Sequence, residues 1–352
     1  MKKILVFSYQ LLGTGGTESV LNSWSKNLEA SGSDYHIDLL IYGNNPDHTF
    51  FENKKIRTIP IEKGYARFLV VKKIRRIVKD GNYDIIICLG LNFLRAINYA
   101  TRLLKRKPKI IYWTHFRVEP NTFSGKTSRL LKTADGILSL CEGMTSQFIE
   151  LGVEKDKIHT IYNPIERAEH KNRSEHGKKF YYVGRLDESQ KRISDIIRAF
   201  YMLKNEGLTD YTLDILGVGE SLYYYVDMIK RFGLQNQVKI HDIWLRKPWD
   251  FINDIDCLIL ASNYEGFGLV ICEAIARGIP VISSNCPVGP SDIIIDNENG
   301  FLYDVGDLMG LKNCIKKVGE LSSMKQDSIS KSIEKMYVDN YFTNVKEILE
   351  KY

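Results

Sequence analysis

The chain has 352 residues, of which 44% are hydrophobic and 26% are charged, and its formal net charge is +6. This composition is typical of a globular protein and unlike that of a disordered or fibrous chain. The length suits two domains that each bury a core. No run approaches the roughly 20 apolar residues that a membrane-spanning helix needs. The apolar run after Lys2 and Lys3 is too short for a signal peptide, so we interpret it as a first strand.

The positive charge is concentrated in the first half. Residues 1–165 carry 25 Lys and Arg against 15 Asp and Glu, whereas the remainder carries 24 against 28. Two basic stretches, 68–79 and 102–109, contribute much of the excess, and we expect helices packed on a sheet with solvated basic faces. Such faces attract anionic lipid headgroups. We therefore expect a cytoplasmic protein, peripheral on the inner face of the cell membrane. Nucleic acid is not an expected partner, because no aromatic residues are interleaved for base stacking.

Cysteine usage indicates buried, reduced thiols in the cytosol. The six cysteines are scattered singly, without a Cys-x-x-Cys pair or a histidine at metal-binding spacing. No metal site is expected from them.

In the N-terminal half, predicted strands alternate with helices, which favours a parallel sheet covered on both faces. The predicted strands are 3–9, 35–43, 84–90, 109–114, 136–141 and 157–162. A glycine-rich loop follows the first strand and leads into a helix that ends near residue 31. This loop lacks the Gly-x-Gly-x-x-Gly spacing of dinucleotide-binding proteins.

A second alternating pattern begins after a polar segment. We divide the chain into a first domain of residues 1–165, a linker of 166–179, a second domain of 180–336 and a C-terminal segment of 337–352 that ends in an amphipathic helix. The second domain is predicted to contain strands at 180–183, 211–216 and 238–242, with helices at 192–206 and 221–232. Both domains are thus predicted to be Rossmann-like.

The most informative stretch is residues 257–290. An apolar run, residues 257–261, is predicted as a buried strand, and the loop after it carries Glu265. Gly266 and Gly268 allow a tight turn into a helix that ends by Gly278. Unpaired N–H groups and the positive end of the helix dipole then meet at one point, which is an anion site suited to phosphate.

Glu265 and Glu273 are eight residues apart at this predicted phosphate site. Two carboxylates would repel a phosphate unless they had another task, and hydrogen bonding to sugar hydroxyls is such a task. The alternative is that Glu265 complements the helix dipole and Glu273 is a solvated helix residue.

The Glu-Gly-Phe-Gly-x-x-x-x-Glu pattern of residues 265–273, followed by Gly-Ile-Pro-Val-Ile-Ser-Ser, resembles the donor-site signature of retaining family-four glycosyltransferases. The resemblance implies the α/β GT-B fold, in which two Rossmann-like domains face each other across a cleft. It implies that Glu265 faces the donor sugar and that Glu273 holds the ribose hydroxyls. The remaining residues that it places in this donor loop are Gly266, Phe267, Gly268 and Leu269. It also implies that the C-terminal helix packs back on the first domain.

A second charged loop follows the strand at 180–183. Arg185 and Lys191 could clamp a diphosphate through charge-assisted hydrogen bonds, or could simply be solvated. The resemblance places both at the pyrophosphate-binding positions, where they would stabilise the departing nucleoside diphosphate. It makes Gly184, Gly217 and Gly219 further donor-site residues, whose missing side chains would let the nucleotide approach the backbone.

The resemblance also implies site residues in the first domain. Gly15 and Gly16 match the Gly-Gly-x-Glu element that faces the cleft. His115 ends a predicted strand, at the edge where open α/β sheets bind ligands, and the resemblance places it beside the transferred sugar. It could otherwise be an ordinary loop residue. Asn92 and Arg117 share this rim and are weaker candidates for contact with the acceptor.

Asp254 and Asp256 spell the Asp-x-Asp that binds Mg²⁺ or Mn²⁺ in other glycosyltransferases. Asp256, however, opens the buried strand and should lie at the wrong end of the sheet. With Arg185 and Lys191 as cations, we expect metal-independent activity and no cofactor besides the UDP-sugar substrate. Since the family retains anomeric configuration without an obvious carboxylate nucleophile, Glu265 would position the sugar during a front-side displacement.

Residues 190–192 and 283–294 look like the corresponding parts of lipopolysaccharide-core galactosyltransferases and related surface-glycan enzymes. This favours a UDP-sugar donor, such as UDP-galactose or an N-acetylhexosamine relative, and a lipid-linked or surface-glycan acceptor. Two other classes stay open at this point: a GT-B epimerase or phosphorylase, and a non-catalytic membrane-associated scaffold.

Overall fold

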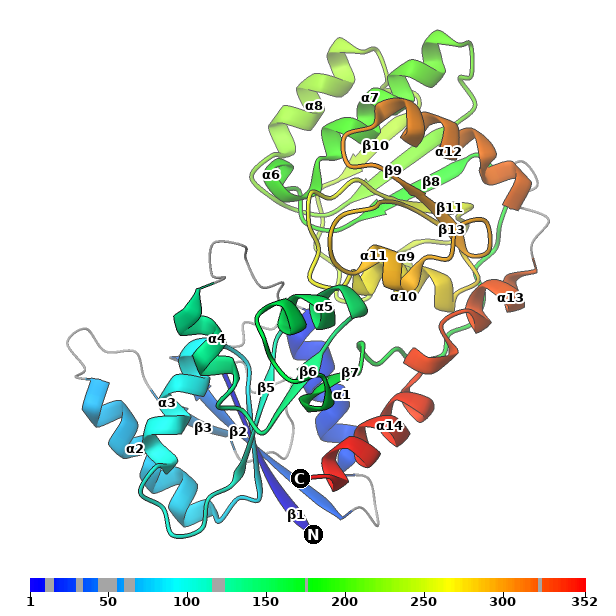
Figure 1. Ribbon diagram of the computed structural model, residues 1–352. Coiled ribbons are helices and arrows are strands. Elements are labelled where there is room, and N and C mark those ends of the chain that lie inside the picture. Colours follow the sequence, from blue (N-terminus) through cyan, green and yellow to red (C-terminus); the bar gives the residue numbers. More distant parts are fainter. Residues whose placement is uncertain are drawn as a thin grey trace. The chain divides into compact units, whose positions relative to one another are not determined.

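The chain folds into two compact units, each an α/β domain built on one parallel sheet (Figure 1). The first unit comprises Met1–Pro164 with Val338–Tyr352, and the second comprises Ile165–Tyr337. The computed structural model describes residues 1–9, 16–29, 34–43, 56–59, 67–115, 124–174, 177–321 and 325–352.

The sheet of the first unit has seven strands in the order β3-β2-β1-β4-β5-β6-β7 among the described residues. They are β1 (Lys2–Tyr9), β2 (Tyr35–Tyr42), β3 (Ile56–Ile59), β4 (Ile85–Cys88), β5 (Lys109–Trp113), β6 (Gly136–Ser139) and β7 (Ile158–Thr160). The helices are α1 (Gly16–Leu28), α2 (Arg67–Gly81), α3 (Leu91–Thr101), α4 (Gly125–Leu131), α5 (Glu142–Glu150), the 3-10 helix η3 (Lys155–Lys157) and α14 (Val338–Glu350).

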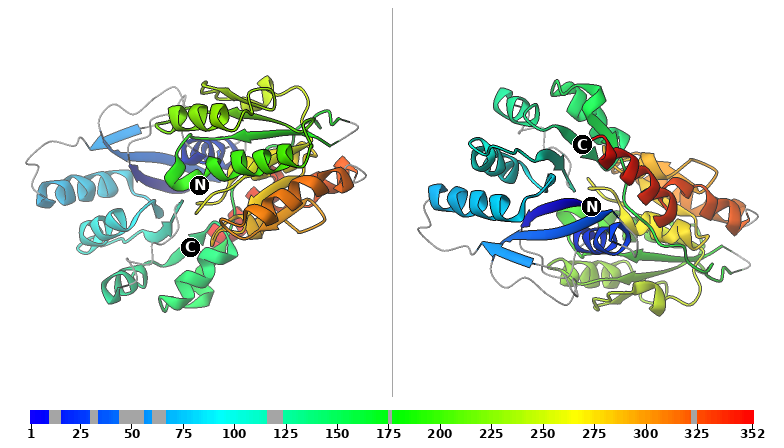
Figure 2. Two further views of the ribbon diagram at one scale, coloured as in Figure 1. Left: turned by 90° about the horizontal axis from the view of Figure 1, so that it is seen from above. Right: turned by 90° about the horizontal axis from the view of Figure 1, so that it is seen from below.

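The central strands of this sheet are buried on both faces. All four residues of β4 are fully buried, as expected where helices cover both sides of a parallel sheet. Helices α2, α3 and α4 lie side by side in the views of Figures 1 and 2. Right-handed crossovers place α1 on the opposite face. The strand order reverses between β1 and β4, so ligands are expected at the carboxyl edge near these strands.

The last helix, α14, packs against α1 within the first unit. The indole of Trp24 donates a hydrogen bond from Nε1 to the hydroxyl of Tyr341 over 2.9 Å. The ring of Trp24 also lies 6.3 Å from that of Phe342 and 4.5 Å from that of Trp113. The C-terminal segment is therefore part of the first unit although it follows the second in sequence.

The second unit contains a parallel sheet in the order β10-β9-β8-β11-β12-β13. Its strands are β8 (Lys179–Val183), β9 (Thr212–Leu216), β10 (Val238–His241), β11 (Cys257–Leu260), β12 (Val281–Ser284) and β13 (Gly300–Tyr303). Its helices are α6 (Glu188–Lys191), α7 (Ile193–Asn205), α8 (Leu222–Arg231), α9 (Pro248–Phe251), α10 (Leu269–Ala276), α11 (Pro290–Ile293), α12 (Leu308–Leu321), α13 (Gln326–Lys331) and the 3-10 helix η4 (Glu334–Met336).

The strand order of this sheet reverses between β8 and β11. The crevice outside the carboxyl ends of these two strands is the position where open α/β sheets bind ligands. The loop with Arg185 follows β8 and the loop with Glu265 follows β11. The topology thus brings two loops that are about 75 residues apart in sequence to one edge.

The structure differs from the sequence-based division at the polar segment 166–179. The middle of this segment is paired with the second unit: the backbone of Lys171 donates to the carbonyl of Arg277, and Asn172 forms a β-bridge with Asp254. The composition of this segment shows that it lacks the apolar residues of a core element. Composition cannot show its backbone pairing, because the pairing partners are distant in sequence.

The cysteines and helices bear on two further expectations. All six cysteines are free, five of them buried, and burial raises the pKa of the Cys286 and Cys314 thiols to about 11. Such thiols stay protonated and unreactive at neutral pH.

None of the helices in the described part of the chain is both long and apolar enough to span a bilayer.

Candidate active site

The turn from β11 into α10 forms the centre of the candidate site. Gly268 precedes the helix with a φ of 91°, a left-handed conformation that favours glycine. A Cβ at this position would lie 2.8 Å from the Ile271 side chain. No side chain caps the helix at Gly268. The first turn of α10 therefore presents backbone N–H groups and the positive end of its dipole, as the sequence predicted.

Glu265 is buried beside this turn and pairs with Lys191. Its Oε1 accepts hydrogen bonds from Lys191 Nζ at 2.7 Å and from Ser262 Oγ at 2.6 Å. The side chains of Glu265 and Lys191 are only 8% and 13% exposed. The other oxygen, Oε2, has no hydrogen-bond partner among the residues that the structure describes. Sequence reasoning assigned these two residues separate ligands and did not anticipate that they pair with each other.

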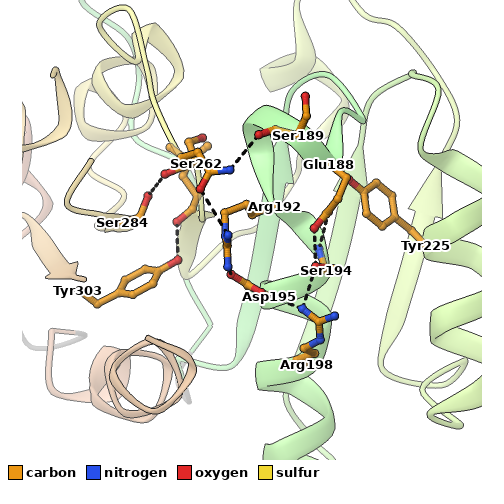
Figure 3. A network of polar contacts seen from close by, with 12 residues as sticks. Glu188, Ser189, Arg192, Ser194, Asp195, Arg198, Tyr225, Ser262, Ser284 and Tyr303 are labelled. Atoms are coloured by element: carbon orange, nitrogen blue, oxygen red, sulfur yellow. Dashed lines mark hydrogen bonds and ion pairs between the residues drawn. The ribbon is translucent and has the colours of Figure 1, made fainter. Parts of the chain in front are cut away.

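The loop that carries Glu265 is held against α6 and α7 (Figure 3). Asn263 donates from its backbone to Gln190 O and from its amide to Ser189 O, both at 2.8 Å. Arg192, at the junction of the two helices, donates to Asn263 and forms an ion pair with Asp195 at 2.7 Å. Lys191 lies between these contacts in sequence, so they set the position of its side chain relative to Glu265.

The same loop is anchored to the next two strands of the sheet. Ser284 of β12 donates to the carbonyl of Ser262 at 2.7 Å, and the hydroxyl of Tyr303 in β13 donates to that of Leu260 at 3.1 Å (Figure 3). The loop that carries Glu265 is therefore hydrogen-bonded both to the α6–α7 junction and to strands β12 and β13. Such preorganisation is what a site needs to position a reacting group.

Arg185 is connected to this loop through Gln190. Its Nη2 donates to Gln190 Oε1 at 2.8 Å, and Gln190 Nε2 donates to Tyr264 O at 3.3 Å. Gln190 is buried, and sequence reasoning did not place it in the site. Its location one residue before Lys191 was the available signal. These bonds tie Arg185 to Tyr264, the residue that precedes Glu265 in the loop.

The glycines after β9 have a structural role that the sequence reasoning did not anticipate. A Cβ on Gly217 would lie 1.8 Å from the carbonyl oxygen of Gly184, and one on Gly219 would lie 2.4 Å from that of Leu186. The backbone of Leu186 also donates to Val218 O at 2.9 Å. These glycines are thus required by the close approach of the loops after β8 and β9, whether or not a nucleotide also contacts them.

Glu273 is not the solvated helix residue of the alternative interpretation. It is half-buried in α10, and its Oε2 accepts a hydrogen bond from Trp249 Nε1 at 2.8 Å. Burial raises the pKa of Glu273, while the bond from Trp249 and the charge of Arg277 act in the opposite direction. Its carboxylate is therefore oriented by the protein and is not freely solvated.

The remaining residues of the predicted donor loop divide into packed and accessible ones. Phe267 is 4% exposed, and a Cβ on Gly289 would lie 2.4 Å from its carbonyl oxygen. Phe267 therefore packs into the domain and is not open to a ligand. Gly266 and Leu269 are half-buried.

Two of the first-unit candidates, Gly15 and Arg117, lie outside the described residues. Gly16 begins α1 and is exposed. Asn92 is exposed near the start of α3, and its amide donates to the Tyr9 hydroxyl at 3.4 Å. Asn92 and His115 thus both follow strands of the first unit at their carboxyl ends.

His115 follows β5, with its ring 4.4 Å from that of Trp113. Its Nε2 is buried and has no hydrogen-bond partner among the described residues. Burial lowers the pKa of His115 to about 3, so its imidazole is neutral at physiological pH. A neutral imidazole suits hydrogen bonding to a sugar hydroxyl, but it cannot act as a cation towards a phosphate.

The Asp-x-Asp sequence stabilises the start of β11. The carboxylate of Asp256 accepts hydrogen bonds from the backbone of Ser174 at 2.6 Å and from that of Lys179 at 2.7 Å. Asp254 forms an ion pair with Lys179 at 2.7 Å. These carboxylates lie at the amino end of the strand, away from Glu265 at the other end.

Comparison with known proteins identifies the family. The structure described as "lipopolysaccharide outer core galactosyltransferase WaaB apo form" matches with a TM-score of 0.86 at 25% identity, over 99% of this chain and 100% of that one. The model for Glycosyl transferases group 1 matches residues 165–336, and that for Glycosyltransferase Family 4 matches residues 14–169. The chain is a glycosyltransferase of the GT-B fold.

Two further relatives of this glycosyltransferase are informative. The lipopolysaccharide 1,6-galactosyltransferase of Salmonella typhimurium is 26% identical over 360 residues, which cover 97% of each chain. The Anabaena protein Alr3699/HepE, solved in complex with UDP, matches over the whole of both chains with a TM-score of 0.81 at 19% identity. The glycosyltransferase therefore resembles lipopolysaccharide-core enzymes over its full length, as its sequence motifs indicated.

Proposed function

We propose that this glycosyltransferase transfers a hexose or N-acetylhexosamine from a UDP-sugar to a lipid-linked or surface-glycan acceptor, with retention of configuration and without a metal ion. The observation that carries the proposal is the buried Glu265–Lys191 pair at the mouth of α10. The Glu265 carboxylate, which we assign to the sugar, and the Lys191 ammonium, which we assign to the diphosphate, are directly hydrogen-bonded to each other. The similar lipopolysaccharide galactosyltransferases support the acceptor class, and the UDP complex of the Anabaena protein supports the nucleotide.

The residues act on the two halves of the donor. The first-turn N–H groups of α10 bind the diphosphate, and Lys191 and Arg185 neutralise the charge that grows on it as the glycosidic bond breaks. Glu265 accepts a sugar hydroxyl through Oε2, the oxygen without a protein partner. It thereby positions the sugar for attack by the acceptor hydroxyl from the side that UDP leaves, while the leaving phosphate accepts the acceptor's proton.

The first test is donor hydrolysis across a panel of UDP-, GDP- and ADP-sugars in EDTA, with UDP-galactose included. We expect slow hydrolysis of one UDP-sugar and undiminished activity in EDTA, because protein cations replace the metal as the electrostatic stabiliser of the leaving group. Chromatography of the released sugar and nucleotide measures the rate, and the anomeric signal of product made with an acceptor reports retention.

Other outcomes would reassign the protein. Interconversion of one UDP-sugar into another would indicate an epimerase, and activity that requires added Mn²⁺ would contradict the metal-independent reaction. If no nucleotide sugar bound or reacted, the transferase proposal would be wrong and a scaffold role would replace it.

We also propose that the first unit docks on the inner face of the cell membrane through α2. Among the described side chains of this helix, the exposed ones are Phe68, Leu69, Lys72, Arg76, Lys79 and Asp80, and Asp80 forms an ion pair with Arg76 at 3.6 Å. Two other cations of the basic stretches make contacts within the fold: Arg75 donates to Ala100 O at 2.9 Å, and Lys109 pairs with Asp135 at 3.2 Å. An apolar tip followed by exposed cations, of which Arg76 also pairs with Asp80, is suited to a bilayer with anionic headgroups.

Reversing the charge of Lys72, Arg76 and Lys79 together is expected to abolish sedimentation with vesicles that contain anionic lipid. Each cation near such a surface contributes about 1 kcal/mol. Donor hydrolysis in solution should be unaffected, because none of these three residues is a proposed donor-site residue. Unchanged sedimentation of the variant, or equal binding of wild type to neutral vesicles, would contradict this docking surface.

A further inference from the structure

A tryptophan that no sequence motif singled out contacts the second glutamate of the donor loop. Trp249, in the short helix α9, is 4% exposed. Its Nε1 donates to Glu273 Oε2 at 2.8 Å. Glu273 Oε1 has no hydrogen-bond partner among the described residues. The indole therefore engages one carboxylate oxygen and leaves the other as an acceptor.

Arg277 holds this pair from the other side. Its guanidinium lies 4.8 Å from the centre of the Trp249 ring, in cation–π geometry, and its Nη1 donates to the backbone carbonyl of Glu273 at 2.8 Å. Arg277 follows α10 one turn after Glu273. Arg277 thus packs against the indole of Trp249 while it is hydrogen-bonded to the backbone of Glu273. These two contacts limit the rotation of the Trp249 and Arg277 side chains.

We infer that Trp249 is a positioning residue that orients Glu273 so that Oε1 accepts the ribose hydroxyls of the donor nucleotide. The inference rests on the proposed function and on the ribose-binding role that the resemblance to family-four glycosyltransferases implies for Glu273. A carboxylate free to rotate would lose side-chain entropy when it bound a hydroxyl, and a preoriented one does not. Trp249 is therefore a determinant of the preference for ribonucleotides over nucleotides that lack ribose hydroxyls.

The test compares the binding of UDP and 2′,3′-dideoxy-UDP by calorimetry in wild type, Trp249→Phe and Glu273→Gln. Phenylalanine keeps an aromatic ring under Arg277, removes the N–H donor and leaves a smaller side chain, whose packing effect should be the same for both ligands. We expect Trp249→Phe to weaken UDP binding by about tenfold, as loss of a charge-assisted hydrogen bond does, and to change dideoxy-UDP binding less than about twofold. Loss of packing alone would weaken both ligands equally.

Tyr337→Phe is a matched control in the same unit. Arg167 lies 4.2 Å from the centre of the Tyr337 ring, and the Tyr337 hydroxyl donates to Ser330 O at 2.8 Å. This variant also keeps a ring beside an arginine and loses one hydrogen-bond donor, but it lies outside the donor loop. We expect it to bind both nucleotides as wild type does.

The outcomes separate the inference from the function on which it rests. If Glu273→Gln keeps the full preference for UDP, or if UDP does not bind, the ribose role of Glu273 is wrong and the inference falls with it. If Glu273→Gln loses the preference and Trp249→Phe keeps it, only the inference is overturned. Equal weakening of UDP and dideoxy-UDP in Trp249→Phe would also overturn it.

Discussion

Replacing Lys191 by methionine is expected to lower kcat by about 10² to 10³, the effect of removing one preorganised group that stabilises charge in a transition state. Methionine keeps most of the side-chain volume but not the ammonium that we assign to the leaving diphosphate. The free energy of unfolding of the variant should also be lower by about 3–5 kcal/mol, because Glu265 would remain buried and charged without its partner. Steady-state kinetics with the donor, together with denaturant unfolding, measure both effects.

Lys312→Met is a control for the removal of a buried lysine from an ion pair. Lys312 is 8% exposed and pairs with Glu206 at 2.5 Å, and Glu206 also pairs with Lys316 at 3.0 Å; none of the three is a proposed site residue. This variant should lose less stability than Lys191→Met, because Glu206 keeps Lys316, and should keep wild-type kcat at temperatures where it is folded. If Lys191→Met kept its kcat as well, the role of Lys191 at the diphosphate would be refuted.

Replacing Glu265 by glutamine is expected to lower kcat about 100-fold, because a misplaced substrate costs a factor of this order. Glutamine has the same shape, so the loss would come from the charge and from weaker hydrogen bonding. The variant should be less stable than wild type, since Lys191 would then be the unpaired buried charge.

The double variant Lys191→Met with Glu265→Gln separates stability from catalysis. It contains no unpaired buried charge, so it should recover most of the stability that either single variant loses. The kcat of the double variant should be no higher than that of the less active of the two single variants. Recovery of activity together with stability would show that the pair supports only the fold.

Much of the fold could be predicted from local patterns. Continuous apolar runs such as residues 85–88 and 257–260 mark strands buried on both faces, and the structure has β4 and β11 there. The glycines at 266 and 268 predicted the turn into a helix, and Gly268 is the N-cap of α10. Element ends are displaced by one to three residues, because strand ends depend on the neighbouring strand. Strand β3 and the single turn α6 were missed, since so short a run carries no clear periodicity. The helix expected over the basic stretch 102–109 was wrong: α3 ends at Thr101, and residue 109 already begins β5.

The sequence by itself determined which chemical groups the donor site has: two glutamates at a fixed spacing, a glycine turn before a helix, and two cations in one loop. These features are local, so a short stretch of sequence contains them completely. The tertiary structure decided how the groups are arranged. Lys191 meets Glu265, Trp249 orients Glu273, and Gly217 makes room for the loop at Gly184. Each of these contacts joins residues that are 24 to 74 positions apart. No periodicity or spacing encodes such a contact, because it exists only once the parallel strands have brought their carboxyl ends to one edge.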